Sequence, residues 1–207
     1  YFKSAFLWRW NLLLLAGDLT AHGEPGEAAE VAAALRGLRV PAAGVLGNHD
    51  LQAGREREIV AIMKAAGVRM LEGACMGVEV RGQVVAVAGA MGFGGGFPPA
   101  MVAEYGEPEM KAFARRGRES AAALAGALEA CAGDLVVALT HYAPVAATLE
   151  GEPEGLFPFL GSHLLAEAID AHGADLAVHG HAHHGAPEGR TPGGVPVRNV
   201  ALPVVGR

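Results

Sequence analysis

Short apolar segments alternate with amphipathic segments along most of this chain. The apolar segments have the length of strands, whereas the amphipathic segments repeat apolar residues at the helical period. Strands that alternate with helices predict an α/β fold with a mixed sheet. The expected strands are residues 11–16, 40–46, 135–139, 175–178 and 195–200, and the expected helices are residues 25–37, 55–66, 108–130 and 162–171.

The middle of the chain departs from this alternation. Three short β-branched segments follow the second expected helix, and a hairpin turn is expected at Arg81 and Gly82, between the last two. A glycine-rich loop comes next, over residues 89–97. This loop lacks the Gly-Lys-Ser/Thr ending of a nucleotide-binding P-loop, so we expect it to form a flexible rim of the active site. The three segments are residues 68–71, 77–80 and 84–88.

The chain has the size and apolar content of one domain. It has 207 residues, of which 51% are hydrophobic, and no Ser- or Pro-rich linker divides it, so residues 1–207 are expected to form a single domain. No apolar run approaches the ~18 residues that span a bilayer, which predicts a soluble protein without a membrane partner. The formal net charge of −6 argues against a long nucleic acid and weakly for a small substrate. The sequence does not indicate an oligomeric state.

The two cysteines, Cys75 and Cys131, lie far apart and lack the C-x-x-C spacing of zinc or redox motifs. We expect buried, reduced thiols rather than a disulfide. This expectation and the absence of a recognisable leader peptide favour a cytoplasmic protein.

Four apolar strands each end in a side chain that can bind a metal. In open α/β sheets the ligand crevice lies beyond the carboxyl ends of the strands, so these endings should converge in space. Gly17, Gly47 and Gly180 precede three of these side chains and allow the backbone to come close to a metal or ligand. The candidate metal ligands are Asp18, Asn48, His141, His181 and His183.

One carboxylate, one amide oxygen and several imidazoles form a mixed nitrogen and oxygen donor set. Such a set suits manganese, iron or zinc. Two divalent cations need an anionic bridge, and Asp18 is the carboxylate available at a strand end. In the segment after Gly47, Asn48 can give a neutral oxygen to a metal and His49 can act as a general acid. Asp50 is expected to hydrogen-bond the far nitrogen of His49 and fix its tautomer.

These motifs, in this order and spacing, resemble those of the calcineurin-like metallophosphoesterases. The motifs are Gly17-Asp18, Gly47-Asn48-His49-Asp50, His141 and Gly180-His181-Ala182-His183, and the resemblance runs from about residue 11 to the end. It implies a four-layered αββα sandwich. It also implies that Asn48, His141 and His181 join Asp18 at one metal, while His183 and Asp18 serve a second.

The sequence departs from the family pattern at its start, where the Asp-x-His that ends the first strand of the family is absent. That pair normally completes the shell of the second metal, so Asp18 and His183 alone would bind this ion weakly. Either the chain starts after this strand, or the second metal site is incomplete. Phe2, Phe6 and Trp10 recur at helical spacing, so residues 1–10 resemble the helix after the missing strand, and we favour a chain that lacks this strand and its motif.

The resemblance implies metal-dependent hydrolysis of a phosphomonoester or phosphodiester, with a hydroxide that bridges two cations as the nucleophile and His49 as the general acid. Protein phosphatases of the family carry an arginine soon after the Gly-Asp motif and a glutamate in place of Asp50. Residues 19–23 contain no arginine, so this subgroup is not expected. No accessory or nucleic-acid-binding domain is recognisable, so a small or modest phosphate ester is the expected substrate. Two alternatives are a catalytically silent scaffold that binds metals loosely and, less favoured, a metal-dependent amide hydrolase.

Overall fold

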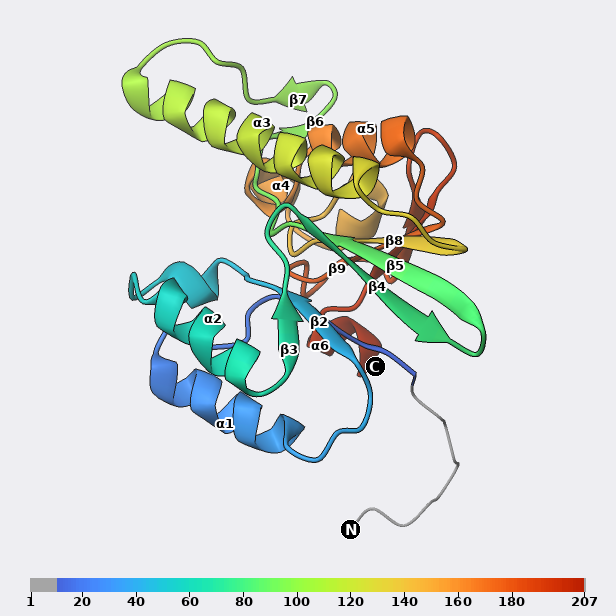
Figure 1. Cartoon of the computed structure of the whole chain (residues 1–207). Coiled ribbons are helices and arrows are strands. Elements are labelled where there is room, and N and C mark those ends of the chain that lie inside the picture. The colour runs from blue at the N-terminus through green and yellow to red at the C-terminus, as the bar shows by residue number, and fades with distance from the viewer. Residues whose placement is uncertain (1–10, 207) are drawn as a thin grey trace.

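The computed structural model describes residues 11–206, and these form two large sheets covered by helices and one small two-stranded sheet (Figure 1). The first sheet is parallel throughout, in the order β1-β2-β3. Its outer face is covered by α1 and α2. The bounds are β1 Leu13–Ala16, α1 Pro25–Leu35, β2 Ala42–Val45, α2 Glu56–Ala65 and β3 Val68–Met70.

The second sheet is mixed and has the order β10-β11-β9-β8-β5-β4. Its four central strands are parallel, and each edge strand is antiparallel to its neighbour. Helices α3 and α5 cover the face that points away from the first sheet (Figure 1). The bounds are β4 Ala74–Val80, β5 Gln83–Gly89, α3 Pro108–Glu129, β8 Leu135–Leu139, α5 His163–His172, β9 Leu176–His179, β10 Glu188–Arg190 and β11 Pro196–Asn199.

Shorter elements connect these layers. The small hairpin of β6 (Gly96–Phe97) and β7 (Ala100–Met101) lies beyond the second sheet, and single helical turns form α4 (Phe157–Leu160) and α6 (Leu202–Val205). Three 3-10 turns are His49–Leu51, Ala146–Leu149 and Glu154–Leu156. The amphipathic helix expected over residues 1–10 lies outside the described residues.

Three apolar clusters hold the layers together. One packs α1 and α2 on the first sheet around Ile59 and Met63, and another packs α3 and α5 on the second sheet around Leu124 and Ile169. Between them, Val45 and six other buried residues from both sheets form a central layer. Burial of apolar area is the main force that favours such layers. The αββα sandwich that the sequence predicts is therefore confirmed.

The two cysteines form a disulfide, so the expectation of reduced thiols is wrong. Cys75 lies on β4 and Cys131 follows α3, with Cα atoms 5.6 Å apart. Helix α3 packs against the sheet that contains β4, which brings together two residues separated by 56 positions in the sequence. The spacing of cysteines carries no information about such packing. The inference of a reducing cytoplasm, which depended on free thiols, loses this support.

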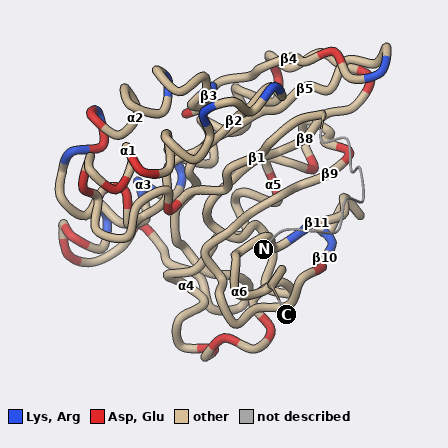
Figure 2. The backbone as a smooth tube through the Cα atoms, turned by 90° about the horizontal axis from the view of Figure 1, so that it is seen from below, with Lys and Arg blue, Asp and Glu red and all other residues tan. Residues whose placement is uncertain are grey.

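Charged side chains are spread over several elements. The charged residues of helix α1 are all acidic, α2 carries both acidic and basic residues, and the tip of the β4–β5 hairpin carries both signs (Figure 2). Within residues 11–206, no helix is both long and apolar enough to cross a membrane.

Candidate metal centre

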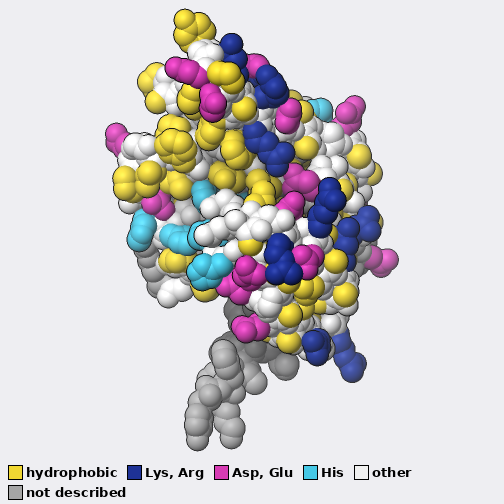
Figure 3. Space-filling view, turned by 90° about the vertical axis from the view of Figure 1, so that its left-hand side faces the viewer, with side chains coloured by type: hydrophobic (Ala, Val, Ile, Leu, Met, Phe, Trp, Pro, Cys, Tyr) yellow, Lys and Arg dark blue, Asp and Glu magenta, His cyan; other side chains and the backbone are white. Residues whose placement is uncertain are grey.

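The strand endings that the sequence singled out converge at one edge of the two sheets. Asp18 follows β1, Asn48 follows β2, His141 follows β8 and His181 follows β9. Figure 3 shows histidine side chains gathered on one face of the molecule. One ligand atom from each of Asp18, His141 and His181 lies within 4.8 Å of the others, which is close enough to hold a single ion.

His141 is held with one nitrogen toward this cluster. Its Nδ1 lies 2.8 Å from the carbonyl oxygen of Ala16, an acceptor, so Nδ1 carries the proton and Nε2 presents a lone pair. Nε2 lies 2.9 Å from Oδ1 of Asn48 and 3.4 Å from Oδ1 of Asp18. Lone pairs of three atoms thus face one another at short distances, an arrangement that a bound cation stabilises. The donor set therefore fits a metal ion.

Burial keeps the two central imidazoles neutral. His141 is only 1% exposed, and desolvation lowers its pKa to about 4, although the hydrogen bond to Ala16 acts in the opposite direction. Burial lowers the pKa of His181 to about 4 as well, and the neighbouring His141 adds to this effect. Nε2 of His181 lies 3.3 Å from the carbonyl oxygen of Phe159, which orients the ring. Both side chains are therefore in the neutral form that binds metals.

The backbone around the cluster requires glycine at two positions. A Cβ on Gly17 would lie 2.4 Å from Nδ1 of His141, and a Cβ on Gly47 would lie 2.2 Å from Oδ1 of Asp18. Asp18 and His181 themselves have positive φ angles of 49° and 66°, which residues other than glycine rarely adopt. Such strain is often found at functional sites.

His183 and His49 stand at the border of this cluster. Both line the same cavity as Asp18, and both are exposed. The backbone N–H of His49 donates to Oδ1 of Asp18 at 3.0 Å, and its Nδ1 lies 2.7 Å from the carbonyl oxygen of Ala21. That carbonyl places the proton on Nδ1 in the neutral ring and leaves Nε2 facing outward.

Asp50 has different partners from those expected. Its carboxylate is fully buried and accepts hydrogen bonds from the backbone N–H groups of Gly47, Leu19 and Thr20 at 2.8, 3.2 and 2.8 Å. The hydroxyl of Thr20 donates a fourth, at 2.7 Å. The predicted contact with the far nitrogen of His49 is therefore wrong, since the Ala21 carbonyl takes that place. Asp50 instead joins the two loops that carry Asp18 and Asn48.

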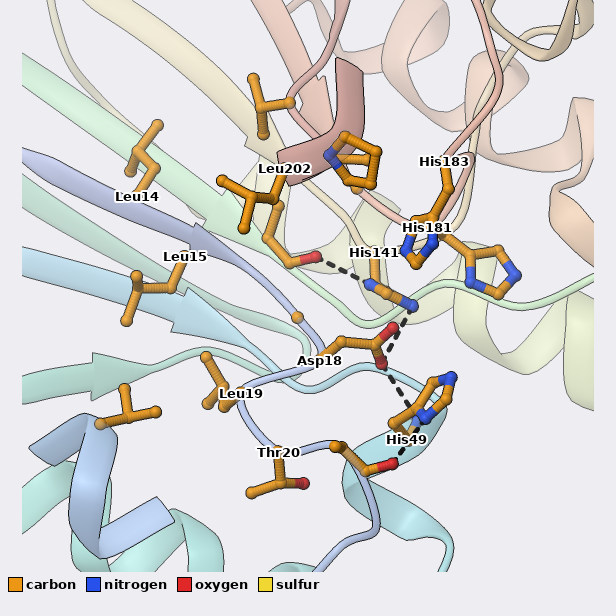
Figure 4. Close-up of a pocket in the computed structure, with 18 residues that line it drawn as sticks. Leu14, Leu15, Asp18, Leu19, Thr20, His49, His141, His181, His183 and Leu202 are labelled. Atoms are coloured by element: carbon orange, nitrogen blue, oxygen red, sulfur yellow. Dashed lines mark hydrogen bonds and ion pairs between the residues drawn. The ribbon is translucent and has the colours of Figure 1, made fainter. Parts of the chain in front are cut away.

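The cavity beside the cluster has a volume of about 700 Å³ and two chemically different ends. The polar end contains Asp18, His49 and the three histidines 141, 181 and 183 (Figure 4). The other end runs along β1 and is apolar, with Leu14, Leu15 and Leu202 among its lining residues. Among the described residues that line it, Asp18 and the histidines are therefore the only metal-binding side chains.

Other residues named from the sequence have structural positions. His179 is fully buried, and its Nε2 lies 2.8 Å from the hydroxyl of Thr148. The loop over residues 89–97 is mostly buried rather than a flexible rim, because it packs between α3 and α5. Phe93 and Gly94 of this loop do line a second cavity beside Asn48 and His181, together with several aromatic residues that the sequence did not single out.

Known structures resemble this chain in fold. Among curated proteins, none matches the chain significantly. Among solved structures, the phosphopantetheinyl hydrolase from Mycobacterium tuberculosis superposes with a TM-score of 0.70 at 18% identity, over 93% of this chain and 79% of that one. A protein from Thermus thermophilus gives 0.52 at 20% identity, over 92% of this chain and 76% of that one.

A putative 5'-nucleotidase from Staphylococcus aureus, in complex with alpha-ketoglutarate, gives a TM-score of 0.55 at 16% identity, over 91% of this chain and 38% of that one. At these identities, the likeness to all three structures shows the fold. The sequence family described as calcineurin-like phosphoesterase matches residues 5–185, which include the whole candidate metal centre. The chain therefore belongs to the calcineurin-like phosphoesterase family.

Proposed function

We propose that this chain is a metal-dependent phosphoesterase that hydrolyses a phosphomonoester or phosphodiester of small or modest size. The observation that carries the proposal is the convergence of Asp18, Asn48 and His141 from three strand ends, with lone pairs facing one another and His181 beside them. Family membership supports the phosphate ester as the substrate class.

Asp18, Asn48, His141 and His181 would hold the first cation. A second cation would have Asp18 and His183. Apart from these two, the first-site ligands, His49 and Thr20, the described residues that line the cavity are apolar or glycine. When bound, such ions act as Lewis acids on phosphoryl oxygens and activate water as a nucleophile. With fewer ligands at the second position, we expect one ion to bind tightly and the second more weakly, whether the metals are manganese, iron or zinc.

The residues of the chain have separate tasks in this reaction. The neutral His141 and His181 offer ring nitrogens as ligands, and the Ala16 carbonyl fixes the orientation of His141. His49 lies next to Asp18 with its Nδ1 bonded to Ala21, so its outer nitrogen is free to carry a proton toward the departing oxygen. Asp50 positions this loop and touches no reacting atom.

The experiment that tests the proposal is hydrolysis of p-nitrophenyl phosphate and bis-p-nitrophenyl phosphate by the chain loaded with manganese, zinc or iron. Asp18→Ala and a chelated sample serve as controls. Activity on either ester that both controls abolish would support the phosphoesterase and distinguish the preference for monoesters or diesters. Silence with every metal would overturn it.

A catalytically silent, metal-binding scaffold is the second candidate. The observation that favours it is the mostly apolar lining of the cavity, which among the described residues leaves a second ion few ligands besides Asp18 and His183. The hydrogen bonds of Asp50 to backbone N–H groups suit a scaffold as well as an enzyme, so this residue does not distinguish the two candidates. A scaffold would bind metal without any turnover of phosphate esters. Parallel assays on amide substrates would identify the less favoured amide hydrolase.

A further inference from the structure

A second cavity of about 300 Å³ opens directly beside the metal centre. Asn48 and His181, two of the proposed metal ligands, line it at one side. Four aromatic residues from separate parts of the chain form much of its remaining wall: Phe93, Phe113, Tyr142 and Phe159. Because the cavity shares residues with the metal centre, a ligand bound at the metals can extend into it.

The aromatic rings form a continuous series that begins at the metal ligand His181. The ring centroid of Tyr142 lies 4.6 Å from that of His181, and the ring centroid of Phe93 lies 5.7 Å from that of Tyr142. Phe113 follows at 4.9 Å from Phe93, and Phe159 at 5.9 Å from Phe113 in an edge-to-face arrangement. Distances between 4.5 and 7 Å with tilted planes are those at which aromatic rings attract one another.

The inner and outer parts of this series differ in their exposure. Tyr142 is buried and helps form the core beneath α3 and α5, so its position is fixed by packing. Phe159 is 58% exposed and Leu156, which lines the same cavity, is 45% exposed. Large apolar side chains that are exposed beside a functional site are typical of ligand-binding surfaces. Figure 3 shows hydrophobic side chains adjoining the histidines on this face.

The chemistry of the lining defines the kind of ligand. Among the described residues that line the cavity, none is acidic or basic apart from His181, which is a proposed metal ligand, so a charged group would lose its hydration there without a charged partner. A flat ring can stack on Phe159 and Phe113, whereas a small alkyl group would leave these faces in contact with water. A volume of about 300 Å³ is large enough for one aromatic ring.

We propose that this cavity binds an aromatic ring in the organic part of the substrate, so that the enzyme selects aromatic phosphate esters over small alkyl esters. The inference rests on the proposed phosphoesterase function and adds the substrate class to it. The phosphate would lie at the metal ligands and the ring among Phe93, Phe113 and Phe159. Phe159 is then a specificity-determining residue.

Binding of two phosphonates to the manganese-loaded chain tests this proposal by calorimetry. Benzylphosphonate carries a ring and ethylphosphonate does not, and neither is hydrolysed. We expect benzylphosphonate to bind several-fold more tightly. Phe159→Ala removes the outer ring but keeps the backbone carbonyl that orients His181. It should reduce the ratio of the two affinities by about 2- to 12-fold, the range for losing one aromatic pair.

Tyr105→Ala is the matched control, because Tyr105 is an aromatic residue that is 85% exposed and does not line this cavity. It should leave the ratio unchanged. Phe113→Leu provides a second variant inside the cavity and should also reduce the ratio. Equal affinities in the parent chain, or a ratio that neither Phe159→Ala nor Phe113→Leu alters, would overturn the aromatic site.

Failure of this inference can be separated from failure of the proposed function. Equal, manganese-dependent binding of both phosphonates would retain the phosphoesterase and refute the aromatic site. If neither phosphonate binds, benzyl alcohol is titrated while the aromatic proton signals are recorded by NMR. Shifts that Phe159→Ala abolishes would then support the aromatic site and contradict the phosphoesterase. No shifts would contradict both.

Discussion

Replacement of Asp50 by asparagine should destabilise the fold rather than act on His49 directly. The buried carboxylate accepts four hydrogen bonds, two on each oxygen, from Gly47, Leu19 and Thr20. The amide oxygen of asparagine can still accept two of these hydrogen bonds. Its amide nitrogen is itself a donor, so it cannot accept the other two. Each hydrogen bond to a charged group contributes about 1.5–3 kcal/mol, so the loss of two predicts about 3–5 kcal/mol after partial relaxation.

Urea denaturation of the metal-free chain measures this loss without any contribution from bound ions. Asp134→Asn is a matched control, because the Asp134 carboxylate accepts a backbone N–H from Val84 at 2.7 Å in an exposed position. Water can replace that bond, so the free energy of unfolding should fall by less than about 1 kcal/mol. Thr20→Val is a milder probe of the Asp50 network and should cost about 1–3 kcal/mol.

The double variant of Asp50→Asn and Thr20→Val completes a thermodynamic cycle. Because the two side chains are in contact, their effects should fail to add by about 1 kcal/mol. An Asp50→Asn chain with unchanged unfolding free energy and greatly reduced turnover would refute this reasoning. That result would restore the original expectation, in which Asp50 acts on His49.

Three further predictions concern other parts of the site and fold. His49→Ala should lower turnover of the best ester by about 10²- to 10⁴-fold with metal content unchanged, measured by steady-state kinetics and elemental analysis; equal turnover would remove His49 from the reaction. Gly17→Ala should weaken manganese binding, measured by calorimetry, because the added Cβ would displace the His141 ring and because residue 17 has a φ of 85°, which alanine rarely adopts; unchanged affinity would contradict this geometry. Titration of the denatured, unreduced chain should find no free thiol, and reduction should lower stability by about 2–4 kcal/mol; two free thiols would contradict the disulfide between Cys75 and Cys131.

The sequence predicts the main layers well because parallel strands that are apolar at every position have a strong local signal. The segment that ends at Ala16 is apolar on every position from Leu12 onward, and the structure places β1 there over Leu13–Ala16. Ser162 was expected to begin a helix, and its hydroxyl oxygen accepts the N–H of Leu164 at the start of α5. Signals of this kind are local, so they can be read from neighbouring residues.

Elements that depend on distant partners were missed or misplaced. Strand β4 begins at Ala74 rather than residue 77, because pairing with β5 extends to Gly89. The strands β6 and β7 have two residues each, too few for a periodic pattern. The aromatic cavity was also missed, since Phe93, Phe113 and Phe159 come from three separate segments that only the folded chain brings together.

Asp50 shows why roles within a predicted site are harder to assign than its location. Its neighbour in the sequence is His49, which suggested a direct hydrogen bond between the two side chains. The sharp turns after β1 and β2, however, leave the N–H groups of Leu19, Thr20 and Gly47 without partners in a sheet, and buried donors must be paired. A buried carboxylate between two such turns satisfies these donors first. The Ala21 carbonyl can then orient His49, which needs only one acceptor. Strand ends therefore predict where the metal ligands meet, whereas the unpaired backbone groups of the connecting loops decide which side chains remain free for chemistry.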